Sequence, residues 1–134
     1  MRFPTLRSTG ASRTILAVET RTTVLIVDDH PSFRACARAI LEADGFSVIG
    51  EAEDGQGALS ALDALSPDVV LLDVQLPDMD GFAVLERLGP ARPQVVLVSS
   101  REASDYNGLI RSSGARGFIA KAELTGAAVR FLLR

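Results

Sequence analysis

A chain of 134 residues with 47% hydrophobic content and a formal net charge of −3 fits one folded domain with a real core. No apolar run approaches the roughly 20 residues that a membrane-spanning helix needs, so we expect no membrane insertion. The single cysteine, Cys36, excludes an internal disulfide, and a reducing, cytoplasmic location is the simplest expectation.

Charge is divided unevenly along the chain. Residues 1–23 hold four arginines against one glutamate, whereas the rest holds 10 basic and 16 acidic residues. We therefore predict an extension at residues 1–22, disordered or created by a start codon placed too early, and one domain at 23–134. An electrostatic tether to a partner or a membrane surface is the alternative interpretation of the extension. The acidic domain has no basic stripe, so we expect no direct nucleic-acid binding by this chain.

From Thr23 onward, short apolar runs alternate with helical patterns. Val24–Val27 is β-branched and apolar on both faces, which predicts a strand covered by helices on both sides. Pro31 suits the first turn of a helix, which we expect to run to about Gly45. The remaining predicted elements are strands at 46–52, 68–73, 94–99 and 117–120 and helices at 56–65, 82–88, 102–113 and from 125. Strict alternation predicts parallel strands with right-handed crossovers in one three-layer α/β domain.

Four of the five predicted strands end in chemically active side chains. The first ends at Asp28 and Asp29, the third at Asp73, the fourth at Ser99 and the fifth at Lys121, the sole lysine. Taken singly, the acids and the serine could be turn or cap residues, and the lysine a surface charge. In parallel α/β sheets, however, ligands bind outside the carboxyl ends of the strands. Their joint occurrence at one edge therefore predicts a functional site.

The residue types at this edge indicate phosphoryl chemistry. Neighbouring carboxylates repel one another unless a cation neutralises them, and oxygen ligands of this kind suit Mg²⁺. A lysine ammonium and a serine hydroxyl can bind phosphoryl oxygens beside the metal. An aspartate such as Asp73 is deprotonated at neutral pH and can itself accept the phosphoryl group.

Four stretches carry a family resemblance: VLIVDDHPSFR, LLDVQLPDMDGFAVLERL, VVLVSS and GARGFIAK. In this order, over roughly Thr23 to Arg134, they resemble the receiver domain of bacterial two-component response regulators. The resemblance implies a doubly wound, flavodoxin-like (βα)5 fold with a parallel sheet of order 2-1-3-4-5. Many receivers follow the lysine with proline, but here Ala122 follows it. That feature and VDDHPSFR are most similar to receivers that precede LuxR-type helix-turn-helix domains.

The resemblance implies a set of metal and acceptor residues. Asp73 corresponds to the phosphoacceptor and Asp29 to a direct Mg²⁺ ligand. Asp28 corresponds to an acid that supports the metal largely through water, and Gln75 would supply its backbone carbonyl. Asp78 and Asp80, in the following loop, are expected to be loop and cap residues rather than ligands.

The resemblance also implies residues that respond to phosphorylation. Ser99 matches the switch hydroxyl and Lys121 the lysine that contacts phosphate. Phe118 matches the aromatic switch position, with a plain core aromatic as the alternative. Arg101 and Gln75 flank the path of the hydrolytic water in this family, so we expect them to set the phosphoryl lifetime.

The predicted function is Mg²⁺-dependent transfer of a phosphoryl group from a histidine kinase or phosphotransfer protein to Asp73. The face made by the fourth helix, fifth strand and fifth helix would then change and bind a downstream protein or a second copy. We expect the domain to be a signalling receiver and not an enzyme, because the only reactions that it would catalyse are its own phosphorylation and dephosphorylation. No DNA-reading element follows VRFLLR, which favours a stand-alone receiver over a piece of a longer regulator.

Two other functions fit part of the pattern. The first is a pseudo-receiver, an interaction module of the same fold that does not use phosphate. The second is an aspartate-nucleophile phosphatase, although haloacid-dehalogenase-like enzymes place a second acid where Gln75 stands.

Overall fold

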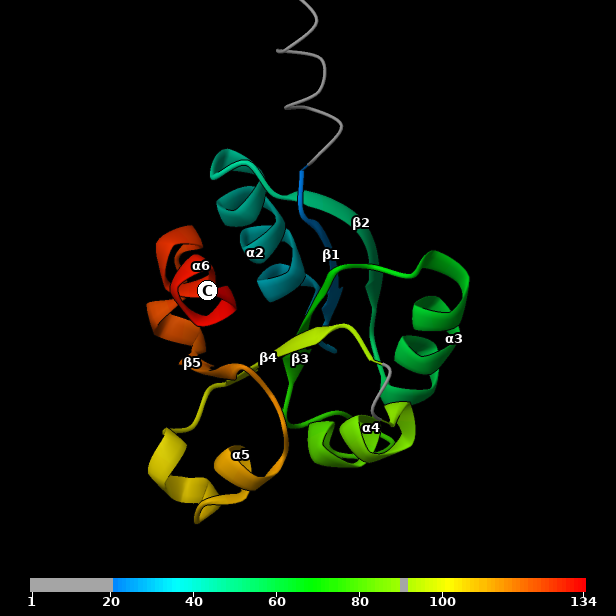
Figure 1. The fold of residues 1–134 in the computed structure, drawn as a ribbon, viewed down its shortest axis with the longest axis vertical. Coiled ribbons are helices and arrows are strands. Elements are labelled where there is room, and N and C mark those ends of the chain that lie inside the picture. Colours follow the sequence, from blue (N-terminus) through cyan, green and yellow to red (C-terminus); the bar gives the residue numbers. More distant parts are fainter. Residues whose placement is uncertain (1–20, 90–91) are drawn as a thin grey trace, which may run out of the picture.

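The computed structural model describes residues 21–89 and 92–134, and the predicted extension at 1–22 lies outside them apart from its last two residues. The described part contains a parallel sheet of five strands in the order β2-β1-β3-β4-β5 (Figure 1). The strands are β1 (Thr23–Val27), β2 (Ser47–Ala52), β3 (Val69–Asp73), β4 (Gln94–Ser99) and β5 (Gly117–Ala120). The predicted fold class and strand order are therefore confirmed.

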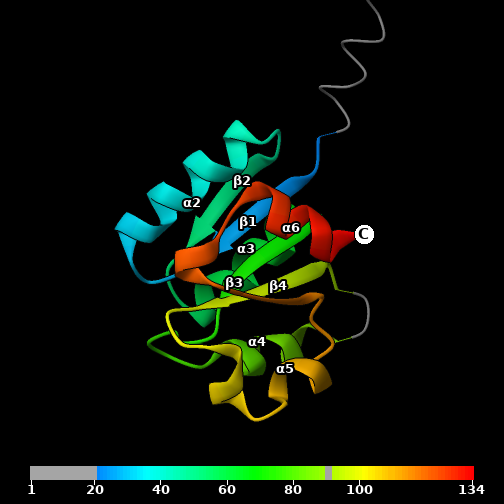
Figure 2. The same cartoon turned by 90° about the vertical axis from the view of Figure 1, so that its left-hand side faces the viewer.

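Helices cover both faces of the sheet (Figures 1 and 2). The helices are α2 (Pro31–Ala43), α3 (Gly55–Leu65), α4 (Gly81–Leu88), α5 (Leu109–Ser112) and α6 (Gly126–Leu133), with 3-10 turns η1 (Ala103–Tyr106) and η2 (Lys121–Glu123). Helices α2 and α6 lie on one face, and α3, α4 and α5 lie on the other. No helix of the described residues has the length and apolar character that a membrane crossing requires.

The central strand β3 shows why an uninterrupted apolar run suits this sheet. Its side chains alternate between the faces, so Val69 and Leu71 pack under α2 and α6, whereas Val70 and Leu72 pack under α3 and α4. All five of its residues are buried. Both faces of a parallel sheet are covered by helices, and an apolar side chain is therefore required at every position before the strand ends at Asp73.

Short polar side chains fix the starts of the helices. Asp54 and Asp80 each accept a backbone N–H bond as N-cap residues of α3 and α4, and Thr125 does the same for α6. Asp78, from the loop after β3, accepts the N–H groups of Gly55 and Gln56 at 2.7 and 2.9 Å. The predicted loop and cap character of Asp78 and Asp80 is confirmed by these contacts.

One predicted element is wrong. The continuous helix expected at 102–113 is two short turns, η1 and α5, and neither contains a buried residue. Asn107 and Gly108 separate them with φ values of 48° and 82°, in the left-handed region that ends a helix. Elsewhere the predicted boundaries agree with the observed ones to within two residues.

Candidate functional site

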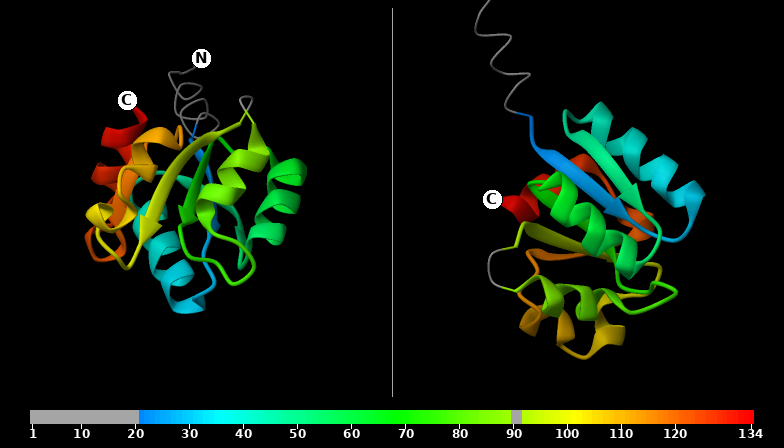
Figure 3. Two further views of the ribbon diagram at one scale, coloured as in Figure 1. Left: turned by 90° about the horizontal axis from the view of Figure 1, so that it is seen from below. Right: turned by 90° about the vertical axis from the view of Figure 1, so that its right-hand side faces the viewer.

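The parallel strands run toward one edge of the sheet (Figure 3), and the predicted acids lie at the strand ends there. Asp28 follows β1, and Asp73 is the last residue of β3, its hydrogen-bonded neighbour. Asp28 is 0% exposed and Asp73 2% exposed. Two carboxylates are thus buried side by side at the end of an apolar sheet, an arrangement that requires a compensating cation.

Lys121 supplies a cation between these two acids. It follows β5, and its Nζ lies 2.6 Å from Asp28 Oδ2 and 3.2 Å from Asp73 Oδ2. The same Nζ lies 4.7 Å from the centroid of the Phe33 ring, which α2 carries over the site. The lysine side chain is only 14% exposed, so these contacts hold the ammonium group within the edge.

Burial is the main cause that raises the pKa of Asp73, to about 6. The backbone N–H of Gln75, at 3.1 Å from Asp73 Oδ1, opposes the rise, whereas the charge of Asp28 adds to it and Lys121 lowers it. Burial alone would lower the pKa of Lys121, but the bond to Asp28 and the charge of Asp73 more than offset it, so the pKa lies above its ordinary value. Lys121 is therefore firmly charged at neutral pH.

The acidic loop after β1 has the donors for a divalent cation. Ligand atoms of Asp28, Asp29, His30 and Asp73 all lie within 4.8 Å of one another. Among the described residues, the buried oxygens Asp28 Oδ2 and Asp29 Oδ1 accept no well-aligned hydrogen bond, although the Lys121 ammonium lies 2.6 Å from the first and His30 Nδ1 lies 3.2 Å from the second. Buried carboxylate oxygens of this kind match the ligands that Mg²⁺ prefers, so the residues present fit the metal that the sequence predicts.

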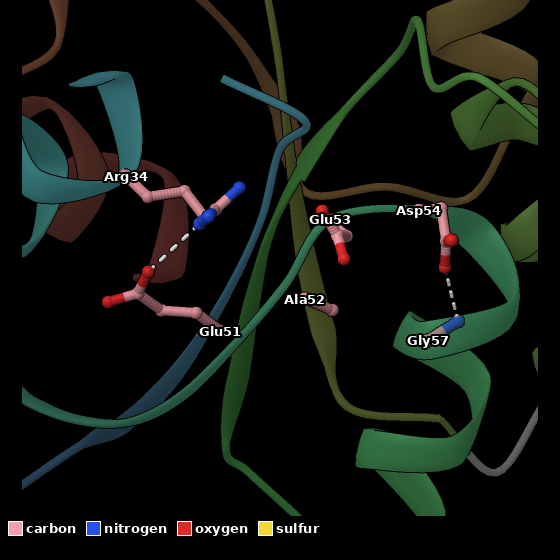
Figure 4. Close-up of a pocket in the computed structure, with 6 residues that line it drawn as sticks. All are labelled: Arg34, Glu51, Ala52, Glu53, Asp54 and Gly57. Atoms are coloured by element: carbon pink, nitrogen blue, oxygen red, sulfur yellow. Dashed lines mark hydrogen bonds and ion pairs between the residues drawn. The ribbon is translucent and has the colours of Figure 1, made fainter. Parts of the chain in front are cut away.

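Arg34 holds this loop in place, a contact that the sequence analysis did not predict. Its guanidinium donates to the backbone carbonyl of Asp28 at 2.6 Å and to Glu51 at 2.9 Å. Glu51, which is not among the predicted site residues, also accepts from Arg38 at 2.9 Å. The Arg34–Glu51 pair borders an open pocket beside Glu53 and α3 (Figure 4). The bond between Arg34 and Glu51 ties the start of α2 to the edge strand β2.

Ser99 lies at the end of β4 and is 0% exposed. Its Oγ accepts the backbone N–H of Arg101 at 3.0 Å and lies 2.6 Å from the Tyr106 hydroxyl. The Tyr106 ring packs on Phe118 with centroids 5.9 Å apart. Tyr106 is not among the residues predicted from the sequence, because its bond to Ser99 depends on how η1 packs beside the end of β4.

The remaining predicted residues lie around this centre. Phe118 is half-buried on β5, and Gln75 and Arg101 are exposed directly beyond the ends of β3 and β4. The Gln75 backbone also forms an isolated bridge with Asp80, which shapes the loop after β3. The structure thus brings Asp28, Asp29, Asp73, Lys121 and Ser99 to one edge, while their chemical roles stay predictions.

A doubly wound parallel sheet with paired acids, a central aspartate and a lysine at one edge defines a small α/β domain with its site at the carboxyl ends of the strands. The family model described as the response regulator receiver domain matches residues 24–128. The chain therefore belongs to the receiver family and is a receiver domain of two-component signalling, as its motifs predicted.

Similar proteins agree with this assignment. The chain is 38% identical over 104 residues to BvgA of Bordetella pertussis, named as a positive transcription regulator of virulence factors, matching 75% of this chain and 49% of BvgA. A protein-glutamate methylesterase/protein-glutamine glutaminase of Burkholderia thailandensis is 40% identical over 106 residues, which cover 76% of this chain and 30% of that protein. The chain thus spans half or less of the length of these curated relatives.

Solved structures show the same fold. The signal receiver domain of the response regulator NarL from Mycobacterium tuberculosis has a TM-score of 0.74 and 32% identity, covering 84% of this chain and 97% of that one. A LuxR-family DNA-binding response regulator from Staphylococcus aureus has a TM-score of 0.75 at 20% identity, covering 84% and 96%. Solved LuxR-family response regulators therefore share the fold of this chain, in line with the resemblance predicted from the sequence.

Proposed function

We propose that the chain accepts a phosphoryl group on Asp73, in a Mg²⁺-dependent reaction with a histidine kinase or phosphotransfer protein. The observation that carries the proposal is the position of the Lys121 ammonium between the buried carboxylates of Asp28 and Asp73. Such a cation neutralises an extra buried acid and can later bind a phosphoryl oxygen. Membership of the receiver family supports the same chemistry.

The side chains of this site have distinct tasks in the proposed transfer. A carboxylate oxygen of Asp73 attacks phosphorus, forming an acyl phosphate as the P–N bond of the donor phosphohistidine breaks and the imidazole leaves. The Gln75 N–H orients the Asp73 carboxylate, and Lys121 neutralises charge on the transferred group. Asp28, Asp29 and the Gln75 carbonyl would hold Mg²⁺, and Ser99 would donate to a phosphoryl oxygen. Bound Mg²⁺ would neutralise the other phosphoryl oxygens.

The proposed output surface comprises α5, β5 and α6, and would bind a downstream protein or a second copy. In the described residues, η1 and α5 contain no buried side chain, so the free energy that holds this segment in one arrangement is small. Leu109 and Phe131 expose 51% and 64% of their surface on α5 and α6. Phosphorylation of Asp73 would shift the population of this segment and so change partner binding, with Phe118 moving behind Ser99.

Arg101 and Gln75 are proposed to set the lifetime of the phosphoryl group. Both follow strand ends beside the acceptor and are exposed, so each can reach the approach path of water. Replacing Arg101 with alanine should change the dephosphorylation rate of purified phosphoprotein. An unchanged rate would remove Arg101 from the proposal.

Intact mass after incubation with Mg²⁺ and acetyl phosphate tests the main proposal. We expect one added phosphoryl group on the wild type, none on Asp73→Asn, and none when a chelator removes Mg²⁺. Equal labelling of Asp73→Asn would place the acceptor elsewhere. Absence of labelling would favour the pseudo-receiver function instead. A cytoplasmic location, where such kinases transfer phosphate, belongs to the same proposal.

A further inference from the structure

The bond between Ser99 and Tyr106 restricts what the serine hydroxyl can do. In the described part of the chain, Ser99 Oγ has two partners, the Arg101 N–H at 3.0 Å and the Tyr106 hydroxyl at 2.6 Å. A serine hydroxyl has one proton to donate and two lone pairs that accept. The Arg101 amide is a donor, so only the tyrosine oxygen can accept the serine proton.

Burial decides the direction of this bond. Ser99 is 0% exposed, so its proton cannot turn to bulk water. Either hydroxyl could donate in this bond, but a buried hydroxyl proton without an acceptor costs free energy, which favours Ser99 as the donor and Tyr106 as the acceptor. The proposed function requires the same proton for a phosphoryl oxygen. The two acceptors compete, because one hydroxyl proton serves only one of them well.

The tyrosine ring connects this competition to the surface. The Tyr106 ring lies 5.8 Å from Phe82 on α4 and 5.9 Å from Phe118 on β5, centroid to centroid. Its backbone belongs to η1, the turn without buried residues that the left-handed Asn107 separates from α5. Phe118 has no hydroxyl and cannot make the bond to Ser99. Tyr106 thus combines a polar contact in the site with an aromatic contact under the exposed segment.

We propose that Tyr106 is a positioning residue that holds the Ser99 hydroxyl in the unphosphorylated protein and loses that bond when a phosphoryl oxygen takes the serine proton. This inference rests on the proposed function and deepens it, because it names the contact that phosphorylation must break. Loss of the bond frees the hydroxyl end of Tyr106, and η1 then moves with the ring that it carries. Ser99 and Tyr106 together form the latch between the site and the exposed segment.

The composition of the chain makes the latch directly observable. Tyr106 is the only tyrosine, and there is no tryptophan, so the near-ultraviolet spectrum reports on this side chain. Beryllium fluoride with Mg²⁺ serves as the probe, since it mimics a phosphoryl group on a carboxylate, and calorimetry measures its binding. We expect a shift of the tyrosine band in the wild type and none in Ser99→Ala at saturating probe.

The outcomes separate the latch from the proposed function. A probe that binds the wild type without a tyrosine shift, or an equal shift in Ser99→Ala, would overturn the latch alone. A probe that fails to bind, or binds Asp73→Asn equally, would overturn the proposed function and the latch with it.

A matched pair of variants tests the energetic side of the competition. Tyr106→Phe keeps the ring between Phe82 and Phe118 but removes the acceptor for the Ser99 proton. We expect it to bind beryllium fluoride about fivefold more tightly than the wild type, equivalent to about 1 kcal/mol for one net hydrogen bond. Ser104→Ala removes an exposed hydroxyl from the same turn and should leave the affinity unchanged. Equal or weaker binding by Tyr106→Phe would refute the competition.

Discussion

Replacing Asp73 with asparagine should stabilise the metal-free protein above neutral pH. Asp73 is buried at the end of an apolar strand, beside the carboxylate of Asp28, and its pKa is raised from 3.8 to about 6. One pH unit corresponds to 1.36 kcal/mol, so ionised Asp73 costs the folded state about 3 kcal/mol. Asparagine avoids this cost because it is neutral, and its side-chain oxygen can still accept the Gln75 N–H.

The sign of the pH dependence follows from the direction of the pKa shift. The folded pKa of Asp73 lies above its unfolded value, so the folded state favours the protonated form. The penalty is absent well below pH 3.8, grows as the pH rises toward about 6, and is complete above that value. The stability difference between variant and wild type should therefore increase across this window and then remain constant.

Urea unfolding in the presence of a chelator measures the effect, with Asp63→Asn as the control at an exposed acid on α3. We expect the free energy of unfolding of Asp73→Asn to exceed that of the wild type by about 3 kcal/mol at about pH 8, and the control to match the wild type. Saturating Mg²⁺ should stabilise the wild type more than Asp73→Asn. A less stable Asp73→Asn without metal, at any pH above about 6, would refute the reasoning.

Three further substitutions test contacts around the site by urea unfolding without metal. Lys121→Met leaves two buried carboxylates without a cation and should lower the free energy of unfolding by about 3–5 kcal/mol. An equally large decrease in an Asp73→Asn background would contradict this cause. Asp78→Ala removes the acceptor of two N–H groups at the start of α3, which lower the pKa of this acid. Asp78→Ala should therefore reduce stability near neutral pH. This loss should disappear at acid pH, where the Asp78 carboxylate of the wild type is protonated. Asp63→Ala should show no such pH dependence. Gly81→Ala places a Cβ 2.7 Å from the Asp73 carbonyl oxygen and should lower the free energy of unfolding by about 1–3 kcal/mol. An unchanged urea midpoint would show that the backbone at the end of β3 can move aside without cost.

The fold could be predicted because its signals are local. Runs such as Val69–Leu72 indicate strands covered on both sides, and the alternation with helical patterns leaves few topologies. The broken helix at 102–113 was missed although Asn107-Gly108, a common turn pair, marked the break. Its sparse apolar residues gave no packing signal strong enough to set the element boundaries.

The site could be predicted only in part. Parallel strands place their final residues at one edge, so the approach of Asp28, Asp73 and Lys121 follows from topology. The bonds of Arg34 to the acidic loop and of Tyr106 to Ser99 do not follow from it, because they depend on how long side chains cross between elements. No local pattern in the sequence encodes such contacts.

Because of the contacts of Asp78, the loop next to Asp73 is held more rigidly toward α3 than toward η1. Through Asp78 the loop after β3 is fastened to the first N–H groups of α3, whereas η1 and α5 beyond β4 contain no buried residue and are joined to the site by the bond of Tyr106 to Ser99. If the backbone near Asp73 shifts, the start of α3 should therefore move little and η1 should move more. We expect the response to added charge to travel mainly toward η1 and α5, while the contacts on the α3 side stay unchanged.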